Sequence, residues 1–174
     1  MKVSAIVLAT ASLFLLPVAR VSAQGVSDAQ IASIVVTANQ VDIDAGQFAA
    51  SQATSDEVKT FARLMVTDHT GVNKQAVDLA TKLGVTPEDN DTAKSLASGG
   101  QANLANLKTL KGKEFDKAYV DHEVAYHQAV LDAVDKTLIP GAKNEELKAL
   151  LVKVRPAFVA HLEHAKMVQS DLSK

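Results

Sequence analysis

Apolar residues recur every three or four positions through almost every long segment of this 174-residue chain. That spacing predicts amphipathic helices, each with one apolar stripe that must be buried against another helix. The stretch DHEVAYHQAV, residues 121–130, places two histidines, a glutamate and a tyrosine in one of these helices. If those polar groups face water, they need no special explanation. If they face the interior, they indicate a functional site or a hydrogen-bonded core.

Capping and helix-breaking residues mark where the first two helices begin and end. Ser27 and Gln30 have the spacing of a capping box and open a helix that is expected to reach about Ala53. Ser55, followed by acidic residues, caps a second helix that ends before Gly84.

The second half of the chain also contains two long helices, which follow a segment with weaker helical periodicity. Residues 92–111 are interrupted by Ser98-Gly99-Gly100 and predict two short helices. A third long helix is expected over residues 113–138, and a fourth starts after Asn144, an N-cap candidate, and continues to about Asp171. Pro156 lies inside the fourth helix, where a missing N–H should kink it; the alternative is two helices that meet there.

This order of segments predicts an all-α fold. Two tightly joined long helices, a crossover and two more tightly joined long helices indicate a ferritin-like antiparallel four-helix bundle. Its helical crossover would link the second and third long helices. Sites in such bundles are built from side chains on facing helices.

The first 23 residues have the pattern of a secretory signal peptide. Lys2 precedes the apolar run AIVLATASLFLLPVA, and Val21-Ser22-Ala23 forms a small-residue cleavage pattern. We expect residues 1–23 to be removed, so that Gln24 begins a single domain over residues 24–174. That length can bury a core without disulfides, and the chain has no cysteine. The predicted location is periplasmic or secreted.

The charge distribution narrows the classes of partner. The chain has 18 basic and 20 acidic residues, and no basic cluster interleaved with aromatic residues, which argues against nucleic acid. Residues 24–174 contain no apolar run long enough to cross a bilayer. An envelope protein or a second copy of the chain is the expected partner. No nucleophile elbow, phosphate loop or cysteine nucleophile occurs, so a binding protein is favoured over an enzyme.

Helical wheels indicate that several polar residues face the core. Glu123 and His127 fall within the apolar stripe of the third long helix, His69 within that of the second and His161 within that of the fourth. Asp42 lies at the edge of the stripe of the first helix. An ionised carboxylate in a core is costly unless it is paired or bound to a metal.

Histidine nitrogen with carboxylate oxygen suits zinc, iron, manganese or copper. We therefore predict a transition-metal site for metal handling or a stress role, formed by His69, Glu123, His127 and His161 with Asp42 as a further ligand. The pattern lacks the paired Glu-x-x-His motifs of di-iron oxidases.

Two alternatives to metal binding remain. The polar residues could form a hydrogen-bonded core in a structural or interaction module of the cell envelope. Glu123 and His127 could also serve an acid–base enzyme, which would need a cleft that reaches them. Asp68 is either an exposed acid or a group that orients an imidazole, and His122 and His164 lie on the flanks of their helices.

Three segments carry a family resemblance: FARLMVTDHTGVNKQAVDLATKLGV, FDKAYVDHEVAYHQAV and VRPAFVAHLEHA. Together they resemble the bacterial exported family called domain of unknown function 4142, and the resemblance extends from about Ser27 to Leu172. It implies a ferritin-like fold and no assigned activity, although members are often labelled outer membrane proteins. Many members have glutamine where this chain has Glu123, and glutamate where it has Asp42. The resemblance therefore implies that a metal-ligating Glu123 is not general to the family.

Overall fold

All regular secondary structure over residues 25–174, the part of the chain that the computed structural model describes, is helical. The elements are α1 (Asp28–Gln52), α2 (Asp56–Lys82), α3 (Asp91–Leu107), α4 (Gly112–Ala133), the π-helical turn η1 (Val134–Leu138), α5 (Ile139–Gly141) and α6 (Glu145–Asp171). The expectation of an all-α chain is thereby confirmed. The predicted signal peptide, residues 1–23, lies outside the described residues.

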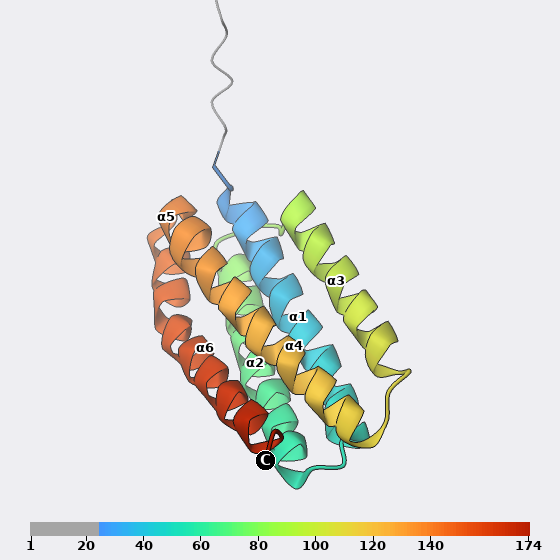
Figure 1. Cartoon of the computed structure of the whole chain (residues 1–174). Helices are drawn as coiled ribbons and strands as arrows, with labels where there is room; N and C mark the ends of the chain where they lie inside the picture. The colour runs from blue at the N-terminus through green and yellow to red at the C-terminus, as the bar shows by residue number, and fades with distance from the viewer. Residues whose placement is uncertain (1–24) are drawn as a thin grey trace, which may run out of the picture.

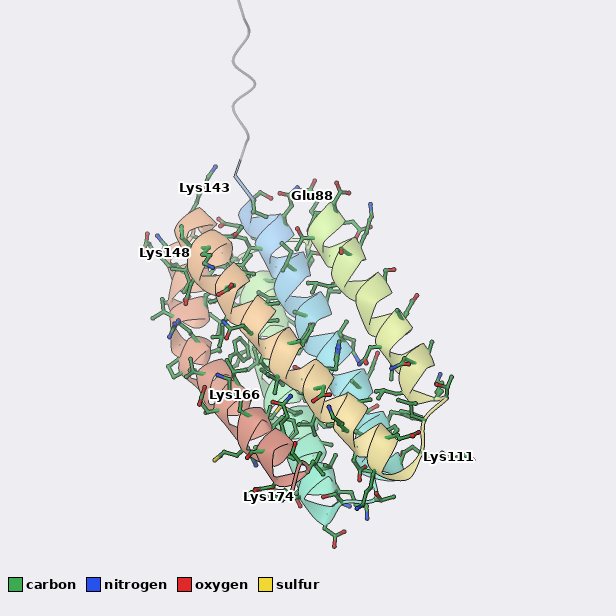
Figure 2. The ribbon with its side chains drawn as sticks, viewed as in Figure 1. Glu88, Lys111, Lys143, Lys148, Lys166 and Lys174 are labelled. Atoms are coloured by element: carbon green, nitrogen blue, oxygen red, sulfur yellow. The ribbon has the colours of Figure 1, made fainter. Side chains whose placement is uncertain are left out.

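The long helices form two antiparallel pairs. Helix α1 packs against α2, and α4 packs against α6. The pairs meet where α2 contacts α6 and α1 contacts α4. Helix α3 connects the pairs in sequence and packs along α1 on the outer side of the bundle (Figure 1). Lysines such as Lys111, Lys143 and Lys166 project outward from this bundle (Figure 2). Within residues 25–174, no helix is long and apolar enough to cross a membrane.

Side-chain caps explain where the helices begin. Ser27 and Gln30 form the predicted capping box at α1, and Ser55 accepts the Val58 N–H at the start of α2. Asn90 and Asn144 cap α3 and α6 in the same way. Each cap satisfies a backbone N–H that has no partner inside its own helix.

Helix α3 is one continuous helix, so the prediction of two short helices over residues 92–111 is wrong. Gly99 and Gly100 lie within it, and Gly100 is buried against Val41 of α1. A Cβ atom at Gly100 would lie 2.7 Å from a Val41 methyl carbon. The glycine therefore allows α3 and α1 to approach closely, and the helix tolerates its low intrinsic propensity because of that packing.

The third long helix continues to Leu138 as predicted, but it is α-helical only as far as Ala133. Its continuation is η1, in which the Ile139 N–H bonds the Val134 carbonyl five residues earlier. Pro140 follows directly and has no N–H to donate to a regular α-helical bond. We attribute the local widening to this proline, since π-helical turns accommodate such interruptions.

Pro156 lies on an exposed position inside α6, which continues unbroken from Glu145 to Asp171. The preferred prediction of one helix is confirmed, and Figure 1 shows α6 changing direction along its length. An exposed proline disturbs the helix less than a buried one because water can satisfy the freed carbonyl.

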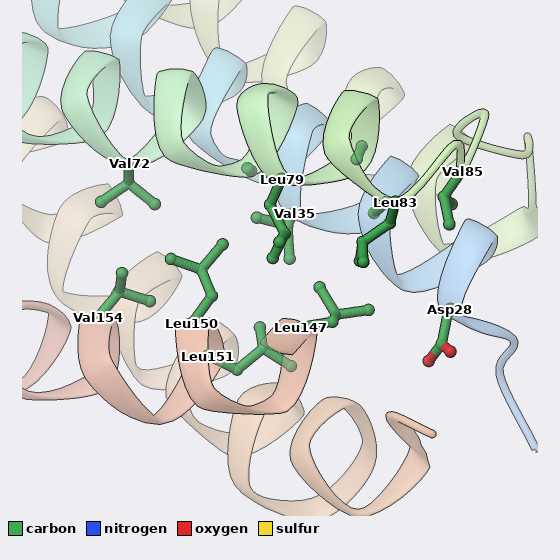
Figure 3. Close-up of a pocket in the computed structure, with 13 residues that line it drawn as sticks. Asp28, Val35, Val72, Leu79, Leu83, Val85, Leu147, Leu150, Leu151 and Val154 are labelled. Atoms are coloured by element: carbon green, nitrogen blue, oxygen red, sulfur yellow. The ribbon is translucent and has the colours of Figure 1, made fainter. Parts of the chain in front are cut away.

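Buried carboxylates and apolar packing hold the ends of the bundle. Asp116 of α4 accepts hydrogen bonds from Thr54 and Ser55 in the turn between α1 and α2, at 2.5–3.3 Å. At the other end, Leu79 of α2 and Leu150 of α6 point toward one another across a small apolar cavity of about 20 Å³ (Figure 3). Both ends therefore fix the register of the helices around the middle of the bundle.

Candidate metal centre

The side chains predicted as ligands meet in the middle of the bundle, and each is only 1–3% exposed. Helix α1 contributes Asp42, α2 contributes His69, α4 contributes Glu123 and His127, and α6 contributes His161. His127 connects two sets whose ligand atoms lie within 4.8 Å of one another: one contains the three histidines, the other both carboxylates. Asp42, predicted at the edge of its stripe, is in fact fully buried.

Asp42 lies closest to the histidines. Its Oδ2 atom is 3.1 Å from Nε2 of His69 and 3.5 Å from Nε2 of His127. The ring centroids of the three histidines are 5.2–5.5 Å apart. Glu123 lies beside both His127 and Asp42: its Oε2 atom is 3.5 Å from Nδ1 of His127, and a carboxyl oxygen lies within 4.8 Å of one of Asp42. Four helices thus direct nitrogen and oxygen atoms toward one small volume.

His69 has its tautomer set by a neighbouring amide. Its Nδ1 is 2.8 Å from Oδ1 of Asn39, whose amide nitrogen donates to the Val35 carbonyl at 2.8 Å. Since the amide donates to Val35, its oxygen must face His69, and Nδ1 must donate to it. The lone pair of His69 is therefore on Nε2, the nitrogen that faces Asp42.

The other two histidines are oriented by oxygen acceptors of their own. Nδ1 of His127 donates to the Glu123 backbone carbonyl at 3.0 Å. Nε2 of His161 is 2.9 Å from Oδ2 of Asp68 on α2. Each ring thus uses one nitrogen to contact an oxygen atom and leaves the other nitrogen free of that contact, the arrangement that orients metal-binding histidines in proteins.

Several nitrogen and oxygen atoms of the cluster have no hydrogen-bond partner in the described residues. Nε2 of His69, Nε2 of His127 and Nδ1 of His161 have no hydrogen-bond partner among the residues the structure describes. Both carboxylate oxygens of Asp42 and Oε2 of Glu123 are also unpaired within residues 25–174. Buried polar atoms are rarely left without a partner, so this concentration of them requires an explanation.

Burial dominates the electrostatics of the cluster. It lowers the pKa of His69 to about 3 and that of His127 to about 4, so both rings are neutral at physiological pH. Burial also raises the pKa of Asp42, and raises that of Glu123 well above its usual range with a further contribution from the Asp42 carboxylate. Without a cation, the surroundings therefore disfavour ionisation of both carboxyl groups.

Aromatic side chains enclose the cluster. Phe158 stacks on His69 with ring centroids 5.5 Å apart, and Tyr119 is fully buried near Glu123. The flank prediction for His122 and His164 is consistent with their half-buried positions, where they pack against Tyr126 and Phe61. Neither histidine belongs to a set of potential ligands in the described chain.

Sequence reasoning missed one orienting residue and left another ambiguous. Asn39 is not among the residues predicted to face the core, yet it is 3% exposed and bonds His69. Its position three residues before Asp42 is a usable signal, since that spacing places both on neighbouring parts of one helix face. Asp68 does orient an imidazole, but that of His161 rather than of its neighbour His69.

Fold and site together define a helical bundle with a buried histidine–carboxylate cluster at its centre. The sequence profile of DUF4142, a domain of unknown function, matches residues 16–168. The chain therefore belongs to the DUF4142 family. No curated protein and no solved structure matches it significantly.

Proposed function

We propose that this protein is an exported, single-domain bundle that binds one divalent transition-metal ion in its core. His69, His127 and His161 supply three nitrogens and Asp42 supplies an oxygen. The observation that carries the proposal is the set of grouped donor atoms: the three histidines, each held by a different acceptor, bring ligand nitrogens within 4.8 Å of one another, and an Asp42 oxygen lies 3.1 Å and 3.5 Å from two of them.

The spacing of these atoms fits the coordination of one ion. In a tetrahedral zinc site with bonds of about 2.0–2.1 Å, neighbouring ligand atoms lie about 3.3 Å apart. The Asp42 oxygen is 3.1 Å from the His69 nitrogen and 3.5 Å from the His127 nitrogen, on either side of that value. None of these atoms has a hydrogen bond in residues 25–174.

A divalent ion would also resolve the electrostatics of the cluster. Two buried carboxyl groups, Asp42 and Glu123, face neutral histidines and have no basic side chain as a partner in the described residues. An ion of charge +2 balances two carboxylates, and it reverses the upward pKa shifts that burial imposes. Glu123 would act as the second counter-charge, either bound to the ion or beside it.

The donor set favours zinc, with copper, iron and manganese as other candidates. Three neutral imidazoles and one carboxylate suit a tetrahedral zinc site, and borderline ligands of this kind also accept the other three ions. The role that follows is metal handling or protection against metal stress in the envelope. The paired Glu-x-x-His motifs of di-iron oxidases are missing from the sequence, so oxygen chemistry is not proposed.

The alternative functions fit the site less well. A structural module with a hydrogen-bonded polar core requires paired polar atoms, whereas at least six in this cluster are unpaired in the described chain. An acid–base enzyme requires solvent or substrate to reach Glu123, and this side chain is 1% exposed.

Elemental analysis of protein purified without chelators tests the proposal. We expect close to one metal ion per chain, and its loss in a His69→Ala/His127→Ala/His161→Ala variant that retains its helical circular dichroism. The control is His164→Ala, which removes a half-buried histidine of α6 outside the cluster. Wild-type protein that contains no metal and binds none of the four candidate ions on titration would refute the proposal.

A further inference from the structure

A second feature of the core is a cavity of about 120 Å³ beside the cluster. It lies between α1, α3, α4, η1 and α6, and Asp42, His69 and His127 form one end of its wall. The π-helical turn contributes Val134 and Leu138 to the opposite part of the wall. Interruptions of this kind occur often at functional sites.

Apart from the cluster, the wall offers an apolar environment. Its side chains include Val35, Leu96, Val130, Val134, Leu138 and Phe158.

The polar side chains elsewhere in the wall are already bonded or exposed. Asn39 bonds His69 and the backbone, and the Tyr126 hydroxyl donates to the Ala38 carbonyl at 2.9 Å. Thr92 of α3 is exposed, as is Ala129 of α4, and these two residues place the mouth of the cavity between α3 and α4. Any molecule that fills the cavity must therefore present an apolar body to most of the wall.

The polar end of the cavity has free acceptors. Nε2 of His69 and Nε2 of His127 each carry a lone pair that no group in residues 25–174 satisfies, and the Asp42 oxygens lie beside them. A ligand with one hydroxyl directed at this end would donate to a buried acceptor that otherwise lacks a donor.

The volume sets the size of the ligand. Apolar protein cavities of about 150 Å³ take up benzene, so 120 Å³ suits a body of about the same size. The smaller cavity near Leu79 and Leu150, about 20 Å³, has room for no more than one water-sized molecule.

We propose that the larger cavity binds a small, uncharged molecule with an apolar body about the size of a benzene ring and one hydroxyl group. The hydroxyl points to the His69–His127–Asp42 end, and the apolar body lies against α1, α3 and η1. This inference uses the same histidines as the proposed function but does not require an ion, because neutral imidazole nitrogens accept hydrogen bonds on their own.

Phenol and toluene form a matched pair of probes, since they have the same number of non-hydrogen atoms and differ only in hydroxyl against methyl. Both are titrated into chelator-treated protein with ¹³C-labelled alanine methyl groups. We expect phenol to shift the methyl signals of Ala38 and Ala133, which line the cavity, and to bind about fivefold more tightly than toluene. Equal affinities for phenol and toluene would refute the proposal that a hydroxyl group bonds the histidine end of the cavity. Unshifted methyl signals of Ala38 and Ala133 would refute binding in this cavity.

Substitutions on α4 provide the control. Ala133→Leu adds three carbons inside the cavity and should abolish binding of both probes, whereas Ala125→Leu makes the same change at an exposed position of the same helix. Undiminished phenol binding by a folded Ala133→Leu variant would refute the site. Should that variant fail to fold, the methyl shifts in the wild-type protein decide the question alone.

Zinc titration of the same samples separates this inference from the proposed function. Protein that binds phenol in the cavity but no metal supports the cavity and refutes the metal site. Protein that binds zinc while neither probe shifts the cavity methyls refutes the cavity and supports the metal site.

Discussion

Glu123→Gln should stabilise the metal-free protein, and by more as the pH rises. Glu123 is 1% exposed, and burial together with Asp42 raises its carboxyl pKa well above the usual range. In the unfolded chain this carboxyl ionises near pH 4.5, but in the folded chain it keeps its proton to higher pH. The stability that this difference contributes is complete below the unfolded pKa and is lost as the pH rises through the folded pKa.

The magnitude follows from proton linkage. While the folded carboxyl stays protonated, each pH unit above the unfolded pKa lowers the free energy of unfolding by about 1.4 kcal/mol. Between pH 5.5 and 7.5 the wild-type protein should therefore lose up to about 3 kcal/mol through Glu123. The Gln variant cannot ionise at this position, so the difference between the two proteins should widen by that amount.

Urea unfolding of chelator-treated protein at pH 5.5, 6.5 and 7.5 measures this difference. Glu114→Gln, at an exposed position of the same helix, is the matched control. Stability curves of wild type and Glu123→Gln that run parallel across the three pH values would contradict the reasoning. They would mean that the folded protein ionises Glu123 as easily as the unfolded chain does.

Three further outcomes are expected. Asn39→Ala should weaken zinc binding by about 10- to 100-fold, because His69 loses the acceptor that orients it. Competition with a chromogenic chelator measures the affinity, and an unchanged affinity would show that Asn39 has no role in the site. Gly100→Ala should lower the free energy of unfolding in urea by about 1–3 kcal/mol, since its Cβ would lie 2.7 Å from Val41. Gly99→Ala, with nothing within 4 Å, should instead raise it by about 0.5–1 kcal/mol, and the reasoning fails if both variants behave alike. Zinc should raise the melting temperature by less at pH 5.5 than at pH 7.5, because protons compete with the ion for the two buried carboxyl groups. Differential scanning fluorimetry measures this rise, and a rise that does not change with pH would argue against carboxylate ligands.

Local chemistry explains why most of the fold was predictable. Ser27, Ser55 and Asn144 cap their helices as the sequence indicates, because capping depends on residues within one turn. The continuity of α3 was missed because its glycine pair reads as a break in isolation. Only the packing of Gly100 against Val41, some sixty residues earlier in the chain, makes a helix favourable there.

The candidate site was likewise predictable only where local sequence determines the outcome. Glu123, His127, His69 and His161 could be predicted to face the core because their direction depends only on helical periodicity. Their orienting partners could not, since these depend on which helices become neighbours. Asp68 is the clearest case: it is adjacent to His69 in sequence, yet it faces α6 and bonds a histidine 93 residues away.

The burial of the ligands has a kinetic consequence. Asp42, His69, His127 and His161 come from four separate helices and are at most 3% exposed, so an ion bound there would reach bulk water only through the cavity beside the cluster. Its entry and release would pass along the apolar wall of this cavity, which disfavours a hydrated cation, so exchange would be slow. Such a protein would retain its ion for long periods even when free metal is scarce, as a store does, rather than pass it quickly to other proteins as a carrier does.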